Sequence, residues 1–212
     1  DINGTRSIYG QGRGSVTPLG GTPPRPTPNP APNPTNDSVI NGTSRKDVLR
    51  GSNRAQMLKG LGGNDTVKAG GGNDKLFGGS GNDRLLGQSG RDWLNGAKTS
   101  GGKPGVGERD VLIGGGDRDV FVLGDRRKVF YNDGIAGSIG KSDYALIRDF
   151  NRNGGDRIQL KGRASNYRLG AAPKGTSSGQ GIFLKTNGQN ELIGVVRGNS
   201  GLSLKSASFT YV

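Results

Sequence analysis

Apolar residues recur every nine positions through the middle of the chain, against a background of glycine and polar residues. The series comprises Leu49, Leu58, Val67, Leu76, Leu85, Leu94, Leu112 and Phe121, and it is broken at Lys103. Successive side chains of a strand point to opposite faces, so one apolar residue per repeat predicts a strand of about three residues that buries only its middle side chain. A regular period of this kind indicates a solenoid.

A polar position with the same period stands two residues before each apolar one. In the most regular part it is Asp65, Asp74, Asp83 and Asp92, which close four uninterrupted copies of G-G-x-G-x-D-x-U-x, where U is apolar. Glycine suits turns that require positive φ. Two repeats make an 18-residue coil with strands in two parallel sheets, and stacked coils bury the apolar row. The pattern therefore predicts an all-β chain: a parallel β-roll followed by a β-rich C-terminal cap.

Stacking places each repeat beside the next but one. Asp65 should lie over Asp83 on one edge of the roll, and Asp74 over Asp92 on the other. Stacked carboxylates repel unless a cation lies between them. Carboxylate and carbonyl oxygens suit Ca²⁺, whereas Mg²⁺ prefers a rigid octahedron and retains its waters.

These repeats resemble the RTX (repeats-in-toxin, hemolysin-type) calcium-binding parallel β-roll family, in particular its cyanobacterial-type secreted members with a C-terminal cap. The resemblance implies two or three Ca²⁺ ions. Each ion would bind carbonyls two and four and the Asp of one turn, and carbonyls one and three and the Asp of the turn stacked on it. The implied first set is Leu61, Gly63, Asp65, Gly78, Ser80 and Asp83. The implied second set is Gly70, Gly72, Asp74, Gly87, Ser89 and Asp92. The implied third set is Gln88, Gly90, Asp92, Gly105, Gly107 and Asp110.

The repeats divide the chain into four expected segments. Residues 1–15 form a polar N-terminal arm, and residues 16–37 a proline-rich, extended linker. Residues 38–124 form the roll, and residues 125–212 a β-rich capping unit that also resembles this family. Residues 96–104 lose both periodic signals over the length of one repeat, and we interpret them as a looped-out or degenerate turn.

The residues that flank the buried apolar positions should point outward. One outward face is expected to carry an apolar ladder of Phe77, Trp93, Val111 and Ile113. A contiguous apolar patch marks a contact. Either the C-terminal unit or the N-terminal arm covers this ladder, or it is an interface with another subunit.

Composition narrows the functional classes. The chain has neither His nor Cys, which excludes Ser-His triads and thiol chemistry, so no enzymatic activity is expected. No apolar run is long enough for a transmembrane helix. The net charge of +13 favours acidic polysaccharide or an anionic cell surface as a partner, while specific nucleic-acid readout has no support. Alternatively, Lys and Arg only solubilise exposed strands.

Together these features predict a secreted, extracellular calcium-binding protein with a structural or adhesive role. Its roll would fold on Ca²⁺, and its N-terminal arm would link neighbours in a filament or surface layer. The start at Asp1 rather than Met suggests a processed or trimmed product. Two alternatives remain open: a C-terminal secretion and calcium-folding module of a larger exoenzyme, and an acidic-polysaccharide-binding module.

Overall fold

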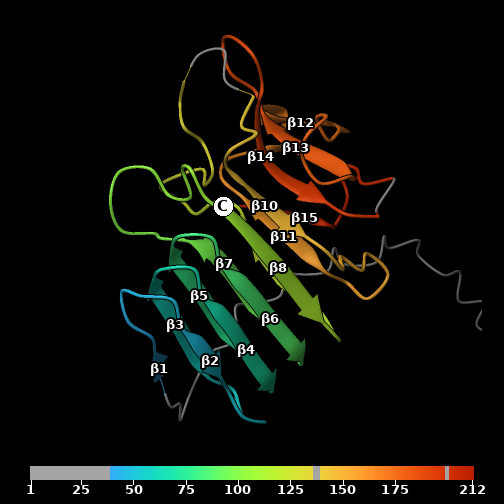
Figure 1. Ribbon diagram of the computed structural model, residues 1–212. Coiled ribbons are helices and arrows are strands. Elements are labelled where there is room, and N and C mark those ends of the chain that lie inside the picture. The colour runs from blue at the N-terminus through green and yellow to red at the C-terminus, as the bar shows by residue number, and fades with distance from the viewer. Residues whose placement is uncertain (1–38, 136–138, 199–200) are drawn as a thin grey trace, which may run out of the picture.

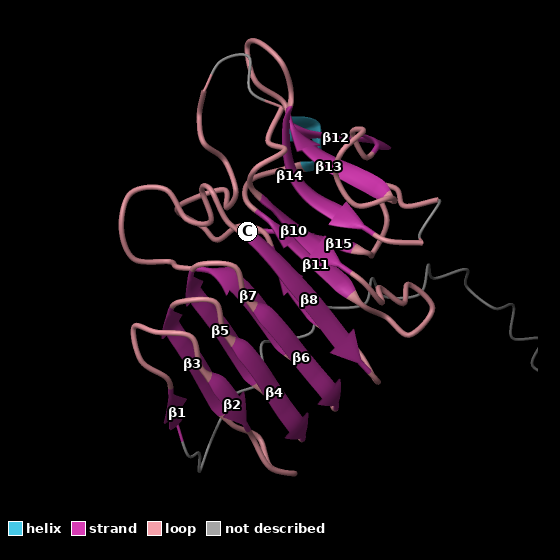
Figure 2. Cartoon of the chain, in the orientation of Figure 1, coloured by secondary structure: helices cyan, strands magenta, loops and turns pink. Residues whose placement is uncertain are grey.

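Two β-sheets lie face to face and coil together along the chain, as the ribbon in Figure 1 shows. The structure is a computed structural model that describes residues 39–135, 139–198 and 201–212. The expected arm (1–15) and linker (16–37) lie outside these residues. Strands and loops make up nearly all of the described chain, with one short 3₁₀ helix, η1 (Ala164–Asn166) (Figure 2).

The two sheets share the strands alternately, as a roll requires. Sheet A contains, in spatial order, β1 (Val39–Asn41), β3 (Met57–Gly62), β5 (Lys75–Ser80), β7 (Trp93–Ala97), β9 (Val120–Val122), β11 (Arg157–Leu160) and β15 (Phe209–Tyr211). Sheet B contains β12 (Tyr167–Ala171), β13 (Gln180–Leu184), β14 (Glu191–Val196), β10 (Tyr144–Ile147), β8 (Arg109–Gly115), β6 (Arg84–Ser89), β4 (Thr66–Gly71) and β2 (Val48–Arg50). The predicted all-β parallel roll is confirmed.

The nine-residue apolar series forms the core between the sheets. Leu58 pairs with Leu76 and Val67 with Leu85, each one coil apart, and all four are fully buried. Burial of about 25 cal/mol per Å² of apolar surface is the main term that holds the coils together.

The strands are longer than the three residues that the repeat predicts. β3 to β6 each have six residues, because the first glycines of the turn still pair with the next coil. Leu61 pairs with Gly79 in this way, and Gly62 with Ser80. The hydrogen-bonded ladder therefore extends into the turns and holds them in register.

Residues 98–108 loop out of both sheets. β6 and β8 consequently pair 27 residues apart, with Leu85 beside Leu112, and so do β7 and β9, with Leu94 beside Phe121. The neighbouring strands before the loop are 18 residues apart. The insertion has the length of one repeat, so the nine-residue phase continues after it although the stacking partners change.

Both sheets continue beyond residue 124, the expected end of the roll. β10 pairs with β8 and β11 with β9, both parallel, and Ile147 and Ile158 extend the buried rows. Only β12, β13 and β14 form an antiparallel meander, which lies at the opposite end of sheet B from β2.

Candidate metal sites in the stacked turns

The backbone of each regular turn takes the left-handed conformation at its second and fourth positions. In the turn 60–65 these are Leu61 (φ 78°) and Gly63 (φ 100°). Their carbonyls point at the turn stacked above, since a Cβ on Gly79 would lie 2.3 Å from Leu61 O and one on Gly81 would lie 2.2 Å from Gly63 O. Glycine at 79 and 81 leaves this space to backbone oxygens.

The aspartates form two continuous columns along the roll. Each backbone N–H donates to the Oδ1 of the next aspartate in its column, as Asp65 does to Asp83 and Asp74 to Asp92, both at 2.8 Å. The column beside sheet B comprises Asp47, Asp65, Asp83 and Asp110. The column beside sheet A comprises Gln56, Asp74, Asp92, Asp119 and Asp156. One oxygen of each carboxylate therefore has a structural role.

The second carboxylate oxygen is the one that fits a metal. Oδ2 is buried and accepts no hydrogen bond in Asp65, Asp83, Asp92 and Asp119. Such an atom normally costs about 1–3 kcal/mol. Around Asp65, a Cβ on Gly60 would lie 2.3 Å from Asp65 Oδ2 and 2.5 Å from Gly78 O, so glycine maintains a pocket of converging oxygens.

Burial makes these carboxylates hard to ionise without a counter-ion. Burial, with smaller contributions from neighbouring carboxylates, raises the pKa of Asp83 to about 8, that of Asp92 to about 9 and that of Asp119 to about 8. A bound divalent cation would reverse this effect by favouring the charged form. Oxygen-only donors from flexible turns are the chemistry of Ca²⁺.

The structure brings the first two sets of predicted ligands together. Residues 60–65 lie against 78–83, and residues 69–74 against 87–92, through the pairings of β3 with β5 and β4 with β6. In these turn pairs the first set would hold one ion and the second set another.

The third predicted set is not brought together. Asp92 lies under Asp119, not Asp110, and Gln88 O accepts the N–H of Gly116 at 2.7 Å. Gly105 instead packs against the Tyr131 ring, and Gly107 has no atom near its Cβ position. The reason is the looped-out stretch, which moves the turn 114–119 into the place above 87–92.

Asp110 instead ends the column that contains Asp83. Its Oδ1 accepts the Asp83 N–H at 2.8 Å, and its Oδ2 accepts the Tyr131 hydroxyl at 2.6 Å. Burial raises the pKa of Asp110 to about 7, while this hydrogen bond lowers it. Unlike Asp83, Asp110 has no buried oxygen left over for an ion.

In the first turn of each column, the side chain at the aspartate position accepts hydrogen bonds from within its own turn. Asp47 Oδ2 accepts the Thr43 N–H (2.6 Å) and hydroxyl (2.8 Å), and Gln56 Oε1 accepts the same two groups of Ser52. These turns have no orphaned oxygen, in keeping with the loss of the regular motif around them.

Three acidic residues beside the turns were not among the predicted ligands. Glu108 accepts the N–H of Gly81 at 2.8 Å, Asp117 accepts that of Gly90 at 3.1 Å, and Asp119 carries one of the orphaned oxygens. Asp119 belongs to the nine-residue aspartate series, so the sequence indicates it as a candidate ligand. Glu108 and Asp117 both stand two residues before a column aspartate, a spacing that identifies them once the loop is recognised.

The predicted apolar ladder is divided between the two sheets. Phe77 and Trp93 are neighbours on sheet A, with ring centroids 5.2 Å apart. Val111 and Ile113 lie on sheet B, beside Arg84 and Leu86. The expectation of one continuous ladder was wrong, because the loop exchanges the sheets to which the later repeats belong.

Within the described residues, no helix combines the length and apolar character needed to span a bilayer.

Comparison with known proteins agrees with this geometry. A search of curated proteins gave no match. The family model of the RTX calcium-binding nonapeptide repeat (four copies) matches in three overlapping registers, residues 41–76, 50–85 and 59–94. The roll thus contains RTX calcium-binding nonapeptide repeats over residues 41–94.

Proposed function

We propose that this protein is an extracellular structural or adhesive protein whose roll is completed by Ca²⁺. The observation that supports this most directly is the set of buried, unpartnered Oδ2 atoms of Asp65, Asp83 and Asp92. Without a cation, each column stacks buried carboxylates at one-coil spacing. The ion is abundant outside cells, so its binding would couple folding to export.

The proposed ions lie between stacked regular turns. One would be held between 60–65 and 78–83, and a second between 69–74 and 87–92. A third would be held between 87–92 and 114–119, where Asp92 and Asp119 replace the pair first expected.

Circular dichroism with a calcium chelator, followed by calcium add-back, tests this proposal. The β signal should fall on chelation and return with Ca²⁺, while Mg²⁺ at the same concentration should restore less of it. A spectrum that changes neither on chelation nor on addition of Ca²⁺ or Mg²⁺ would show that the fold does not depend on a metal ion.

Self-association through sheet edges is part of the proposal. Among the described residues, β1 and β2 are the terminal strands of sheets A and B, and Val39 and Val48 on them are 50% and 57% exposed. An exposed edge can accept an added strand from another chain. The N-terminal arm (1–15) would supply that strand, so removing it should abolish assembly in light scattering, whereas persistent assembly would exclude the arm as the link.

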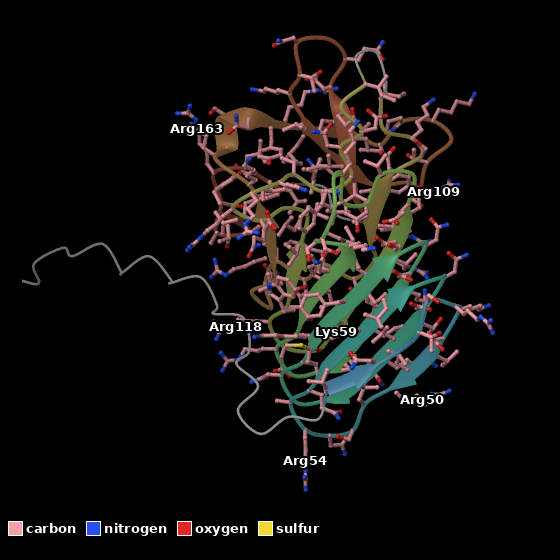
Figure 3. All side chains as sticks on the ribbon, turned by 90° about the vertical axis from the view of Figure 1, so that its left-hand side faces the viewer. Arg50, Arg54, Lys59, Arg109, Arg118 and Arg163 are labelled. Carbon is pink, nitrogen blue, oxygen red and sulfur yellow. The ribbon has the colours of Figure 1, made fainter. Side chains whose placement is uncertain are left out.

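A second candidate function, binding of acidic polysaccharide, is favoured by the surface charge of the roll. Between residues 39 and 124 all thirteen Lys and Arg side chains are exposed or half-buried. Of the nine acidic residues there, six are buried, which leaves only Asp47, Glu108 and Asp117 exposed or half-buried. Arg50 and Arg54 point away from the roll in Figure 3. Binding to an acidic glycan should weaken steeply with salt, and a neutral glycan of equal size should not bind.

The exoenzyme alternative has a different consequence. If the chain is a secretion and calcium-folding module, it would be joined in its precursor to a catalytic domain. The sequence of the full gene product distinguishes this alternative from a free-standing structural protein.

A further inference from the structure

Three buried carboxylates outside the repeats converge at the N-terminal ends of two neighbouring strands of sheet B. Asp133, Asp143 and Glu191 are 7%, 0% and 1% exposed, and each offers an oxygen within 4.8 Å of the others. Asp143 directly precedes β10 and Glu191 begins β14, which pairs with β10 in parallel, so the starts of these strands lie side by side. Asp133 comes from the loop between β9 and β10.

The hydrogen bonds of the cluster leave one buried oxygen without a partner. Asp133 Oδ1 accepts the Ile135 N–H at 2.6 Å, Glu191 Oε1 accepts the Asp133 N–H at 3.1 Å, and Asp143 Oδ1 accepts the Ser142 hydroxyl at 2.7 Å. Asp143 Oδ2 is buried and accepts none. A fully buried, unpartnered carboxylate oxygen beside two other carboxylates is costly unless a cation completes it.

Charge around the cluster points the same way. The Lys103 ammonium contacts the cluster, but it donates to the backbone carbonyl of Asp133 and not to a carboxylate. Burial raises the pKa of Glu191 to about 7, with a further rise from Asp133 and Asp143, and burial together with Asp133 raises the pKa of Asp143. Burial and neighbouring carboxylates therefore disfavour the charged forms of Asp143 and Glu191.

The spacing suits calcium. Oxygens that bind one Ca²⁺ at about 2.3–2.6 Å lie at most about 5 Å apart. The three carboxylate oxygens lie within 4.8 Å of one another, so one Ca²⁺ can contact all of them.

We propose that Asp133, Asp143 and Glu191 bind a further Ca²⁺ ion, separate from those of the repeats. This ion would fasten three segments that are distant in sequence: the loop after β9, the start of β10 and the start of β14. It would also fix the inserted loop 98–108, because Lys103 contacts Asp133 O. The capping strands would then be held to the roll by metal as well as by packing.

Equilibrium dialysis of the full chain at saturating calcium tests this site. Asp143→Asn and Glu191→Gln should each bind one ion fewer per chain than the unmodified protein. Asp125→Asn is the matched control, since its side chain only accepts the Arg127 and Lys128 N–H groups, which an amide can also accept. An unchanged ion count in folded Asp143→Asn would overturn the proposal and leave a cluster that shares protons.

A measurement on the unmodified chain covers the case in which both variants misfold. In a crystal structure determined in calcium, an ion should lie among the three carboxylates, and its position separates it from any ion in the turns. Turns filled with calcium beside an empty cluster would contradict this site alone. A filled cluster beside empty turns would contradict the sites proposed in the repeats and support this one.

Discussion

Tyr131 donates its hydroxyl hydrogen bond to Asp110 Oδ2 across 2.6 Å, and both residues are fully buried. Asp110 is the last aspartate of its column. Its Oδ2 accepts the tyrosine hydroxyl, whereas the Oδ2 of Asp83, the preceding aspartate in the column, has no hydrogen-bond partner. One column of carboxylates thus ends in a neutral hydrogen-bond donor.

Tyr131→Phe should destabilise the calcium-free protein by about 1–3 kcal/mol, because it orphans a buried carboxylate oxygen without changing the ring. Thermal unfolding in chelator measures this loss. Tyr144→Phe is the control, since its hydroxyl makes only a 3.3 Å contact with the Ser177 N–H. An equal loss of stability in the two variants would show that the hydrogen bond to Asp110 contributes no more than the contact made by Tyr144.

Gly78→Ala should impair both folding and calcium binding. The added Cβ would lie 2.3 Å from Asp83 Oδ2 and 2.7 Å from Gly96 O, in the space between the converging oxygens. Overpacking of this kind costs about 1–3 kcal/mol. Calcium titration followed by circular dichroism measures the shift. Gly102→Ala, which meets no atom within 4 Å, should behave like the unmodified chain, and so should Gly78→Ala if the pocket has no role.

Asp92→Asn should weaken calcium binding while sparing the calcium-free fold. The amide oxygen can still accept the Asp74 N–H, but the charge shared by two turn pairs is lost. We expect calorimetry to show at least tenfold weaker calcium binding, which is a loss of about 1.4 kcal/mol of binding free energy. The Tm in chelator should not fall. Asp125→Asn is the comparison, because Asp125 lies outside the proposed turn pairs and its carboxylate accepts the Arg127 and Lys128 N–H groups, which an amide can also accept. A large loss of Tm in chelator would assign Asp92 a purely structural role.

The calcium-free roll should lose stability as pH rises. The folded pKa values of Asp83 (about 8), Asp92 (about 9) and Asp119 (about 8) lie above the unfolded value of about 4, so the folded state binds more protons between these limits. This contribution to stability is complete below about pH 4 and disappears as pH approaches about 9. Tm in chelator should therefore fall across this range, whereas calcium affinity should rise. A Tm in chelator that rises from pH 5 to pH 8 would contradict this predicted loss of stability.

The fold was largely predictable because the apolar and aspartate series are local and strictly periodic. Leu58, Leu76 and Asp65 occupy the places that stacking by 18 residues requires. The partners of Asp92 could not be found by counting, since a looped-out stretch of one repeat length leaves the phase unchanged. Only the sheet pairing distinguishes a step of 18 from one of 27.

The cluster of Asp133, Asp143 and Glu191 had no such signal. Its members come from a loop and two strand starts, and up to 58 residues separate them. No spacing rule connects them, because their proximity results from the pairing of β10 with β14 and from the path of an irregular loop.

The loop of residues 98–108 also shows how a roll of this kind can change its length. The strands after it enter the stack with their apolar side chains still facing inward, and β10 and β11 do so after connections of other lengths. The length of such a loop is therefore not tied to the alternation of buried and exposed positions. The exposed stretch 98–102 of this loop is thus a natural place to graft a foreign peptide, because Pro104 and Gly105 would keep their contacts with Tyr131.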